Sequence, residues 1–216
     1  DREDPQTGWL VTSYGKIYRT SDRGVNWIKV ADSSVSGHYF YGTAFEQSHH
    51  DPNVLYVGGS GYDGSALYRS SDRGQTWGAF GTGLPDTLIY SLVALDDGSG
   101  RLLAGTETGP YMMNPNSGEW TDISDNRAPV TIYWSGELLP ESGTVRFGTY
   151  GRGIWDYLPP APDVWPEETG VNDETGDISV DTDVIDLSVQ QIAGGGCGCQ
   201  NTLSTPHVWW LVAPAF

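Results

Sequence analysis

The sequence predicts an all-β fold: a β-propeller of four-stranded antiparallel blades, followed by a largely disordered acidic tail. An internal repeat and a series of short strand-like runs carry this prediction. The runs are β-branched and aromatic, and Gly, Asp, Asn or Pro residues separate them. Glycine (29), tyrosine (12) and tryptophan (9) are abundant among the 216 residues, which is typical of a chain rich in strands and turns. No part of the body shows a helical period.

The repeat sets the predicted blades. Residues 17–27 and 67–77 lie 50 positions apart and are identical at seven of eleven positions. A degenerate third copy spans residues 110–120, and a fourth unit covers residues 145–157. With the apolar runs upstream, each unit provides four short strands, so residues 1–158 hold about three and a half blades. Because propellers use about 4–8 blades, we expect a fragment of a larger propeller, whose last blade borrows its outer strand from residues before Asp1.

The two well-preserved copies share a polar turn that ends at a tryptophan. We expect its Asp and Ser side chains to accept hydrogen bonds from turn amides, its glycine to adopt a positive φ, and its tryptophan to bury a large ring. The turn residues are Ser21, Asp22, Gly24 and Trp27 in one copy and Ser71, Asp72, Gly74 and Trp77 in the other.

This turn resembles the Asp-box, or BNR repeat, of sialidases, sortilin-like proteins and several glycoside hydrolases. The resemblance covers residues 9–157. It implies that the turn is structural and lies at the rim of the blades. It is specific for the fold, but it does not identify a function, because the same fold serves enzymes and binding proteins.

Candidate site residues lie in the loops at the other end of the predicted strands. These loops combine aromatic rings, which can stack on sugar faces, with carboxylates, which can bond to hydroxyl groups. Glycoside hydrolysis needs two carboxylates about 5–9.5 Å apart. The catalytic candidates are Asp63, Asp86, Glu107 and Asp125. The ligand-binding candidates are His38, Tyr39, Tyr62, Arg127, Tyr150 and Arg152.

Two enzyme families with similar repeats provide a test. A resemblance to sialidases implies three arginines that bind the carboxylate of the substrate. No arginine outside the Asp-box turns lies in a sequence context typical of this triad. A resemblance to xyloglucan-cleaving endoglucanases implies two catalytic aspartates in a cleft between two propellers, and neither aspartate can be matched to this chain. The sialidase hypothesis is therefore the weaker of the two.

The charge of the chain excludes several partners. Eleven Lys and Arg residues against 28 Asp and Glu residues give a net charge of −17. Phosphate binding needs a basic surface, so we expect neither nucleic acid nor an anionic membrane as a partner. The His49-His50-Asp51 segment is interpreted as a turn before a strand, and no metal site, cofactor or oligomer is predicted.

The tail changes in composition after the repeats. Residues 159–193 form a Pro-rich and acidic linker or stalk. Residues 194–216 contain Cys197 and Cys199 and then an apolar segment. They resemble the C-terminal sorting tags of myxobacterial and related exported proteins, with a truncated hydrophobic helix and without the usual arginines. The resemblance implies processing at the cysteines and membrane contact only through the tag. The alternative is a disordered tail with a redox or adventitious metal pair.

Two functional hypotheses remain open at this stage. The first is an exported bacterial module, extracellular or at the cell surface, that binds a glycan or a protein or acts as a scaffold. The second is a glycoside hydrolase, xyloglucanase-like or sialidase-like, with its catalytic residues mainly outside this sequence. A pair of carboxylates on the loop side would favour the enzyme, and a surface rich in Tyr and Trp would favour binding.

Overall fold

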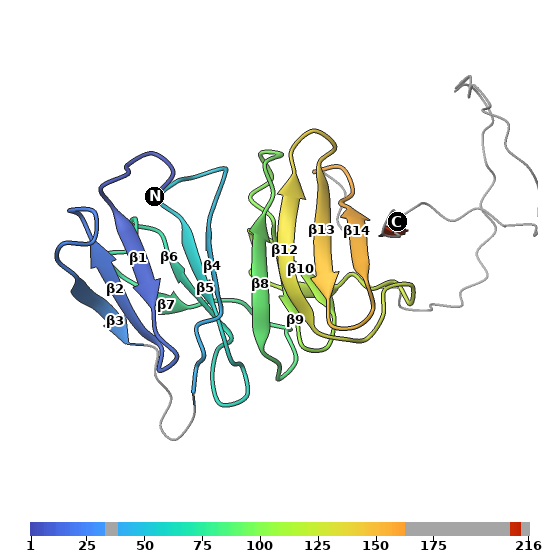
Figure 1. Ribbon diagram of the computed structural model, residues 1–216, viewed down its shortest axis with the longest axis horizontal. Helices are drawn as coiled ribbons and strands as arrows, with labels where there is room; N and C mark the ends of the chain where they lie inside the picture. The colour runs from blue at the N-terminus through green and yellow to red at the C-terminus, as the bar shows by residue number, and fades with distance from the viewer. Residues whose placement is uncertain (33–38, 163–207, 213–216) are drawn as a thin grey trace, which may run out of the picture. The chain divides into compact units, whose positions relative to one another are not determined.

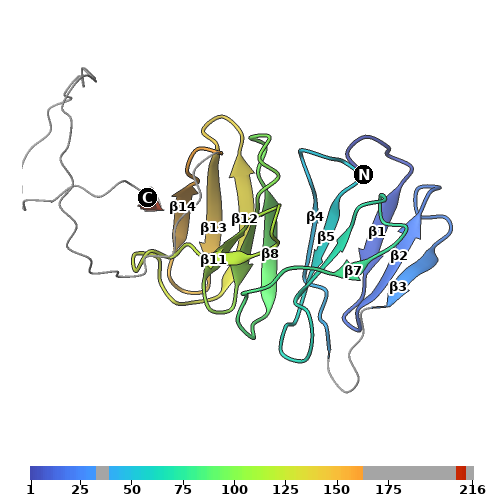
Figure 2. The same cartoon turned by 180° about the vertical axis from the view of Figure 1, so that it is seen from behind.

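The computed structural model describes residues 1–32 and 39–162, and the backbone of residues 208–212. All regular elements among the described residues are β-strands, arranged in four antiparallel sheets that follow one another along the chain. Figure 1 shows the sheets coloured in chain order, and Figure 2 shows them from behind. The predicted all-β class is confirmed. No helix in the described ranges is long and apolar enough to span a bilayer.

Each sheet follows an up-and-down order, in which strands that are consecutive in sequence are hydrogen-bonded neighbours. Short turns suffice for such a connection, because antiparallel strands end beside the start of the next. The first sheet contains β1 (Gly8–Val11), β2 (Lys16–Thr20) and β3 (Ile28–Asp32). The second contains β4 (Ala44–Gln47), β5 (Leu55–Gly58), β6 (Leu67–Ser70) and β7 (Gly78–Ala79). The third contains β8 (Ile89–Ala94), β9 (Leu102–Thr106), β10 (Pro110–Met113) and β11 (Trp120–Asp122).

The fourth sheet contains β12 (Tyr133–Leu139), β13 (Thr144–Thr149), β14 (Ile154–Leu158) and β15 (Val208–Val212). It corrects two expectations. Residues 208–212 form a strand instead of the start of a hydrophobic helix, and this strand takes the outer position expected for residues before Asp1. β15 pairs antiparallel with β14, with Val208 opposite Leu158. The edge of β14 carries backbone groups that need partners, and a β-branched and aromatic segment suits a strand.

Apolar side chains pack between neighbouring sheets in three clusters. β5 and β9 are buried along their whole length, as expected for strands covered on both faces. The sheets approach closely at Gly58, where a Cβ would lie 2.7 Å from the Ile89 side chain. The fully buried members of the three clusters include Ile17 and Val57, Leu67 and Ile89, and Leu103 and Phe147.

The repeated polar turns connect β2 to β3 and β6 to β7. In the second turn the Asp72 carboxylate accepts hydrogen bonds from the backbone N–H groups of Gln75 (3.1 Å) and Thr76 (2.9 Å) and from the Thr76 hydroxyl (2.6 Å). Burial of this carboxylate acts to raise its pKa, but the hydrogen bonds outweigh burial and lower the pKa of Asp72 to about 2. The Trp77 indole donates to the Gly74 carbonyl at 3.2 Å.

One residue of the predicted turn motif is displaced by one position. The hydroxyl that bonds to the Asp carboxylate belongs to Thr20 and Ser70, at 2.8 Å in both copies, and the same hydroxyls accept from the glycine N–H groups. Ser21 and Ser71, which the sequence analysis assigned to this role, are exposed. Strand alternation explains the difference, because the last residue of each strand points inward and the next one points outward.

The two turns differ in what covers them. The N-terminal segment lies over the second turn: Arg73 binds the Asp1 carboxylate at 2.6 and 2.9 Å and Glu3 at 3.2 Å. A Cβ at Gly74 would lie only 2.0 Å from the Trp9 indole nitrogen. The first turn is less covered: the Arg23 N–H donates to the Gln6 carbonyl at 2.9 Å, but the Trp27 ring, which was expected to be buried, is 42% exposed. The same local structure therefore forms under different degrees of tertiary cover.

Candidate ligand-binding site

Because the strands are antiparallel and consecutive, the connections between them alternate between two opposite ends of each sheet. The polar turns lie at one end. The other end, here called the loop face, carries the β1–β2, β5–β6, β9–β10 and β13–β14 turns and the segments that connect successive sheets. Loop-borne side chains on a rigid scaffold are the usual location of binding sites.

Aromatic rings follow one another across the loop face. Tyr39 contacts Tyr14 with ring centroids 4.9 Å apart and Tyr41 with centroids 5.7 Å apart. Trp134 contacts Tyr90 at 4.7 Å and Tyr150 at 6.1 Å. All except Tyr90 are 48–65% exposed. The six residues Tyr14, Tyr39, Tyr41, Tyr90, Trp134 and Tyr150 are called the aromatic strip.

A cavity of about 800 Å³ lies where the two halves of the aromatic strip meet. Its base includes an antiparallel bridge between Ser60 and Leu88, which joins the second and third sheets. This loop-face cavity is lined by Tyr39, Tyr41, Thr43, Ser60, Tyr62, Asp63, Leu88, Tyr90 and Glu107.

A hydrogen bond crosses the loop-face cavity between two sheets. The Tyr62 hydroxyl, on the β5–β6 loop, donates to Glu107 Oε2 at 2.6 Å, on the β9–β10 turn. This bond is the main reason why the pKa of Tyr62 is raised; burial and the charges of Glu107 and Asp86 act in the same direction. Burial, and next the charge of Glu107, raise the pKa of Tyr90. The Glu107 N–H donates to the Leu88 carbonyl at 3.0 Å, which fixes the turn.

The backbone is strained at one wall of the cavity. Tyr41 has a φ of 68°, in the left-handed region that bulky side chains avoid. Its N–H donates to the Ser13 carbonyl at 2.8 Å, which holds this conformation. Strain of this kind costs of order 1–3 kcal/mol and gathers at functional sites. Here it directs an aromatic ring to the cavity.

Four of the predicted site residues come together in the loop-face cavity: Tyr39, Tyr62, Asp63 and Glu107. Tyr150 belongs to the aromatic strip, and Asp86 lies close enough to Tyr62 for its charge to act on it.

Three other predicted residues, Asp125, Arg127 and Arg152, belong neither to the cavity lining nor to the aromatic strip. Asp125 pairs with Arg127 at 3.6 Å on the β11–β12 connection, and neither residue lines the cavity. The Arg152 carbonyl accepts a hydrogen bond from the Trp155 indole at 2.8 Å. His38, Cys197 and Cys199 lie outside the described residues.

Four members of the aromatic strip were not among the predicted site residues: Tyr14, Tyr41, Tyr90 and Trp134. Each lies at or next to the loop-face end of a strand or connection, so strand direction could have included them. Nothing in the sequence shows the contact between Tyr90 and Trp134, because these two residues lie on strands of different sheets.

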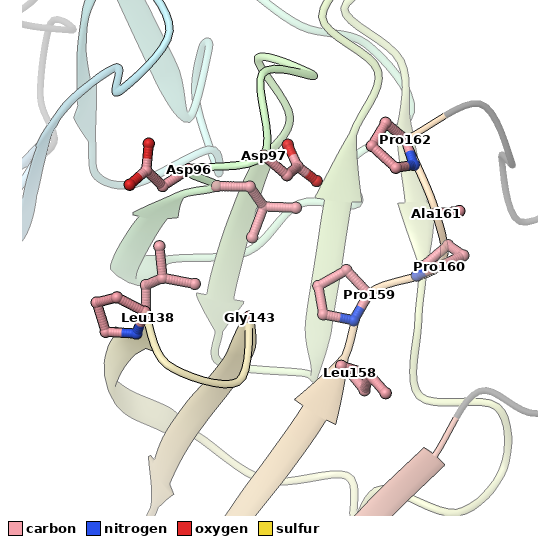
Figure 3. A pocket seen from close by; sticks show the side chains of 11 residues that line it. Asp96, Asp97, Leu138, Gly143, Leu158, Pro159, Pro160, Ala161 and Pro162 are labelled. Carbon is pink, nitrogen blue, oxygen red and sulfur yellow. The ribbon is translucent and has the colours of Figure 1, made fainter.

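A second cavity of about 230 Å³ lies at the opposite end of the third and fourth sheets. Figure 3 shows Leu158–Pro162 along one side, with Asp96 and Asp97 nearby. Buried Arg101 fixes the position of the Leu158–Pro162 segment, since it binds Asp97 at 2.5 Å and the Pro160 carbonyl at 2.9 Å. Within the described residues this cavity has no aromatic lining, whereas the loop-face cavity has four tyrosines. The loop-face cavity is therefore the stronger candidate.

The residues present suit an organic ligand better than a metal. Over the described ranges, no three His, Cys, Asp or Glu side chains are placed to share a metal ion. Tyrosine rings offer apolar faces and polar hydroxyls together. With the two carboxylates, they can bind a ligand that has both flat apolar faces and hydroxyl or amino groups.

Comparisons with known proteins agree with this architecture. A scan against protein-family models found no match. The sequence is 30% identical over 163 residues to the xyloglucanase Xgh74A of Acetivibrio thermocellus, an alignment that covers 59% of this chain and 19% of that protein. The chain thus spans about a fifth of the length of this curated relative.

Solved structures extend the comparison. The crystal structure of an ancestral GH74 enzyme superposes with a TM-score of 0.52 at 18% identity, over 69% of this chain and 21% of that one. The described sheets form part of a β-propeller. The structure of YCF48 bound to D1 peptide matches 71% of this chain and 46% of that one, with a TM-score of 0.49 at 21% identity.

Proposed function

We propose that this chain is an exported propeller module of the Asp-box type that binds a glycan along the aromatic strip. The aromatic strip together with the loop-face cavity is the observation that carries the proposal. Six rings cross the loop face, and the cavity between them provides carboxylates and hydroxyls. Sugars present the same combination of apolar ring faces and polar edges. The similarity to a xyloglucanase supports a plant-type β-glucan as the first ligand to test.

The Asp-box assignment is part of the proposal. The hydrogen bonds of Asp22 and Asp72 within their own turns give each a structural role, and their distance from the loop face argues against a catalytic one. Export is proposed from the resemblance of residues 194–216 to sorting tags. The role of Cys197 and Cys199 as the processing site stays a prediction.

A glycoside hydrolase is the second candidate, and one observation favours it. Asp63 and Glu107 line the same cavity, as a pair of catalytic carboxylates would. A general acid, however, usually lies in an apolar pocket that excludes water. Asp63 is exposed, and Glu107 is held by the Tyr62 hydroxyl. Binding therefore explains the arrangement better than hydrolysis.

The test is to measure retention and product formation together. The chain is applied to immobilised xyloglucan, mixed-linkage β-glucan and peptidoglycan, and the soluble fraction is analysed for oligosaccharides by mass spectrometry. Trp134→Ala should weaken retention about tenfold, a loss of about 1.4 kcal/mol that is ordinary for a central aromatic contact. Trp27→Ala is the matched control, because Trp27 is similarly exposed (42% against 49%) but lies at the opposite end of the sheets.

The outcomes separate the candidates. Retention without products supports a binding module. New oligosaccharides that disappear in Glu107→Gln would identify a hydrolase. Equal losses in the two tryptophan variants, or no retention on any polymer, would overturn the glycan proposal.

A further inference from the structure

The wall of the loop-face cavity is acidic. Asp63 and Glu107 line it, and no Lys, Arg or His is found among the described residues that form it. Asp86 adds a third negative charge near Tyr62. Every titratable neighbour that acts on Tyr62 or Tyr90 is a carboxylate or another tyrosine. A concave wall of one sign concentrates ligands of the opposite sign, so the cavity favours cations.

The rings of the cavity add to this preference. Tyr39, Tyr41, Tyr62 and Tyr90 surround a single space. The faces of aromatic rings carry negative potential and attract ammonium groups, by about 0.5–1 kcal/mol at exposed sites and more where water is excluded. A neutral sugar would use only the apolar surface of these rings, whereas a cation would use their electrostatics as well.

Glu107 offers a free acceptor in the cavity. Its Oε2 receives the Tyr62 hydroxyl, and no hydrogen bond from another described side chain reaches its Oε1. The backbone bond of Glu107 to the Leu88 carbonyl holds the residue in place. An ammonium group carries three donors and no acceptor, so it fits an acidic, ring-lined space of this type.

We propose that the loop-face cavity binds the protonated amine of an amino sugar, so that the aromatic strip prefers amine-bearing glycans to neutral and anionic ones. This inference rests on the proposed function, because it specifies the charge of the glycan that the same site takes. It makes Glu107 and Asp63 the residues that determine specificity and the aromatic strip the general sugar-binding surface.

Calorimetric titration with four hexasaccharides tests the proposal at mildly acidic pH: glucosamine, N-acetylglucosamine, glucose (cellohexaose) and galacturonate units. The variants are Glu107→Gln and Asp63→Asn, both nearly isosteric. Glu141→Gln is the matched control, since Glu141 is an exposed carboxylate on the β12–β13 turn at the other end of the sheets. Far-UV circular dichroism checks that each variant is folded.

We expect the glucosamine hexamer to bind about fivefold more tightly than its N-acetylated form, because one partly exposed charge pair contributes up to about 1 kcal/mol. Glu107→Gln should remove most of that ratio, because it should weaken binding of the glucosamine hexamer far more than binding of the neutral hexamers. Raising the ionic strength to about 1 M, where the Debye length is about 3 Å, should remove the ratio as well.

Two results would overturn the inference alone: equal binding of the amine and acetamide forms by the native chain, or a preference that persists in Glu107→Gln and Asp63→Asn. Binding of none of the four hexasaccharides would instead overturn the proposed glycan function, and the inference with it.

Discussion

The paired polar turns allow a sharp test of how tertiary cover acts on one local structure. Gly24 and Gly74 occupy the same position of the repeat, with φ values of 85° and 75°. An alanine at either position is forced into the left-handed region, at a cost of roughly 1–2 kcal/mol. At Gly24 the new Cβ would meet the Trp27 ring at an ordinary 3.5 Å. At Gly74 it would lie 2.0 Å from the Trp9 indole nitrogen.

The second substitution must therefore displace Trp9, whose ring stacks on Phe45 with centroids 5.7 Å apart. Overpacking of this kind typically costs about 1–3 kcal/mol. We expect Gly24→Ala to lower the free energy of unfolding by about 1 kcal/mol and Gly74→Ala to lower it by about 3 kcal/mol.

Urea unfolding followed by far-UV circular dichroism measures both effects without relying on tryptophan fluorescence. In a Trp9→Ala background the obstruction is gone, so Gly74→Ala should cost only about 1 kcal/mol, as at Gly24. Equal costs for the two single variants, or no relief from Trp9→Ala, would refute the argument that the N-terminal segment packs on the second turn.

Three further predictions follow from single side chains. Asp72→Asn should lower the free energy of unfolding by about 1 kcal/mol at neutral pH, after discounting for solvent screening. Hydrogen bonds to the carboxylate outweigh burial and lower the pKa of Asp72 from 3.8 in the unfolded chain to about 2 in the folded chain. The stability that the Asp72 carboxylate contributes is therefore complete at a pH above 3.8 and is lost as the pH falls through about 2. Urea midpoints of native and variant chains should thus differ at neutral pH and converge near pH 2. Tyr41→Asn should leave the urea midpoint of unfolding unchanged or raise it, because Asn tolerates a positive φ. The same variant should weaken glycan retention about tenfold, and retention equal to that of the native chain would contradict this. Arg101→Met should cost about 3 kcal/mol in thermal or urea unfolding, because it removes the bonds of a buried guanidinium to Asp97 and to the Pro160 carbonyl. A cost no larger than that of Arg146→Met, whose arginine side chain is 39% exposed, would contradict this.

The loop-face site could be predicted in part. Strand alternation and antiparallel order place Tyr39, Tyr62, Asp63 and Glu107 at one end of the sheets, and the structure brings these four together. Asp125 also lies in a loop at this end of the sheets, but it pairs with Arg127 and does not line the cavity. Being at the correct end of a sheet is a weaker condition than facing a shared cavity.

Other contacts depend on partners far away in the sequence. Tyr62 and Glu107 are 45 residues apart, and Tyr90 and Trp134 lie on inner strands of different sheets. Such pairs depend on how far and at what angle two sheets pack, which no local pattern records. The same holds for β15, whose pairing with the edge of β14, about 50 residues earlier in the chain, replaces the helix that the resemblance to sorting tags implied.

The sequence by itself determined the strands and the polar turns, because both follow from interactions within a few residues. In each turn the Asp side chain bonds to amides three or four positions along the same chain, so the motif forms wherever those residues occur. Only the tertiary structure decided that Trp9 packs on the second polar turn while the Trp27 ring of the first turn stays exposed. It also decided that the six rings of the aromatic strip and the carboxylates of Asp63 and Glu107 share the loop face. These outcomes depend on the packing of whole sheets, a long-range balance of apolar burial that short sequence patterns do not contain.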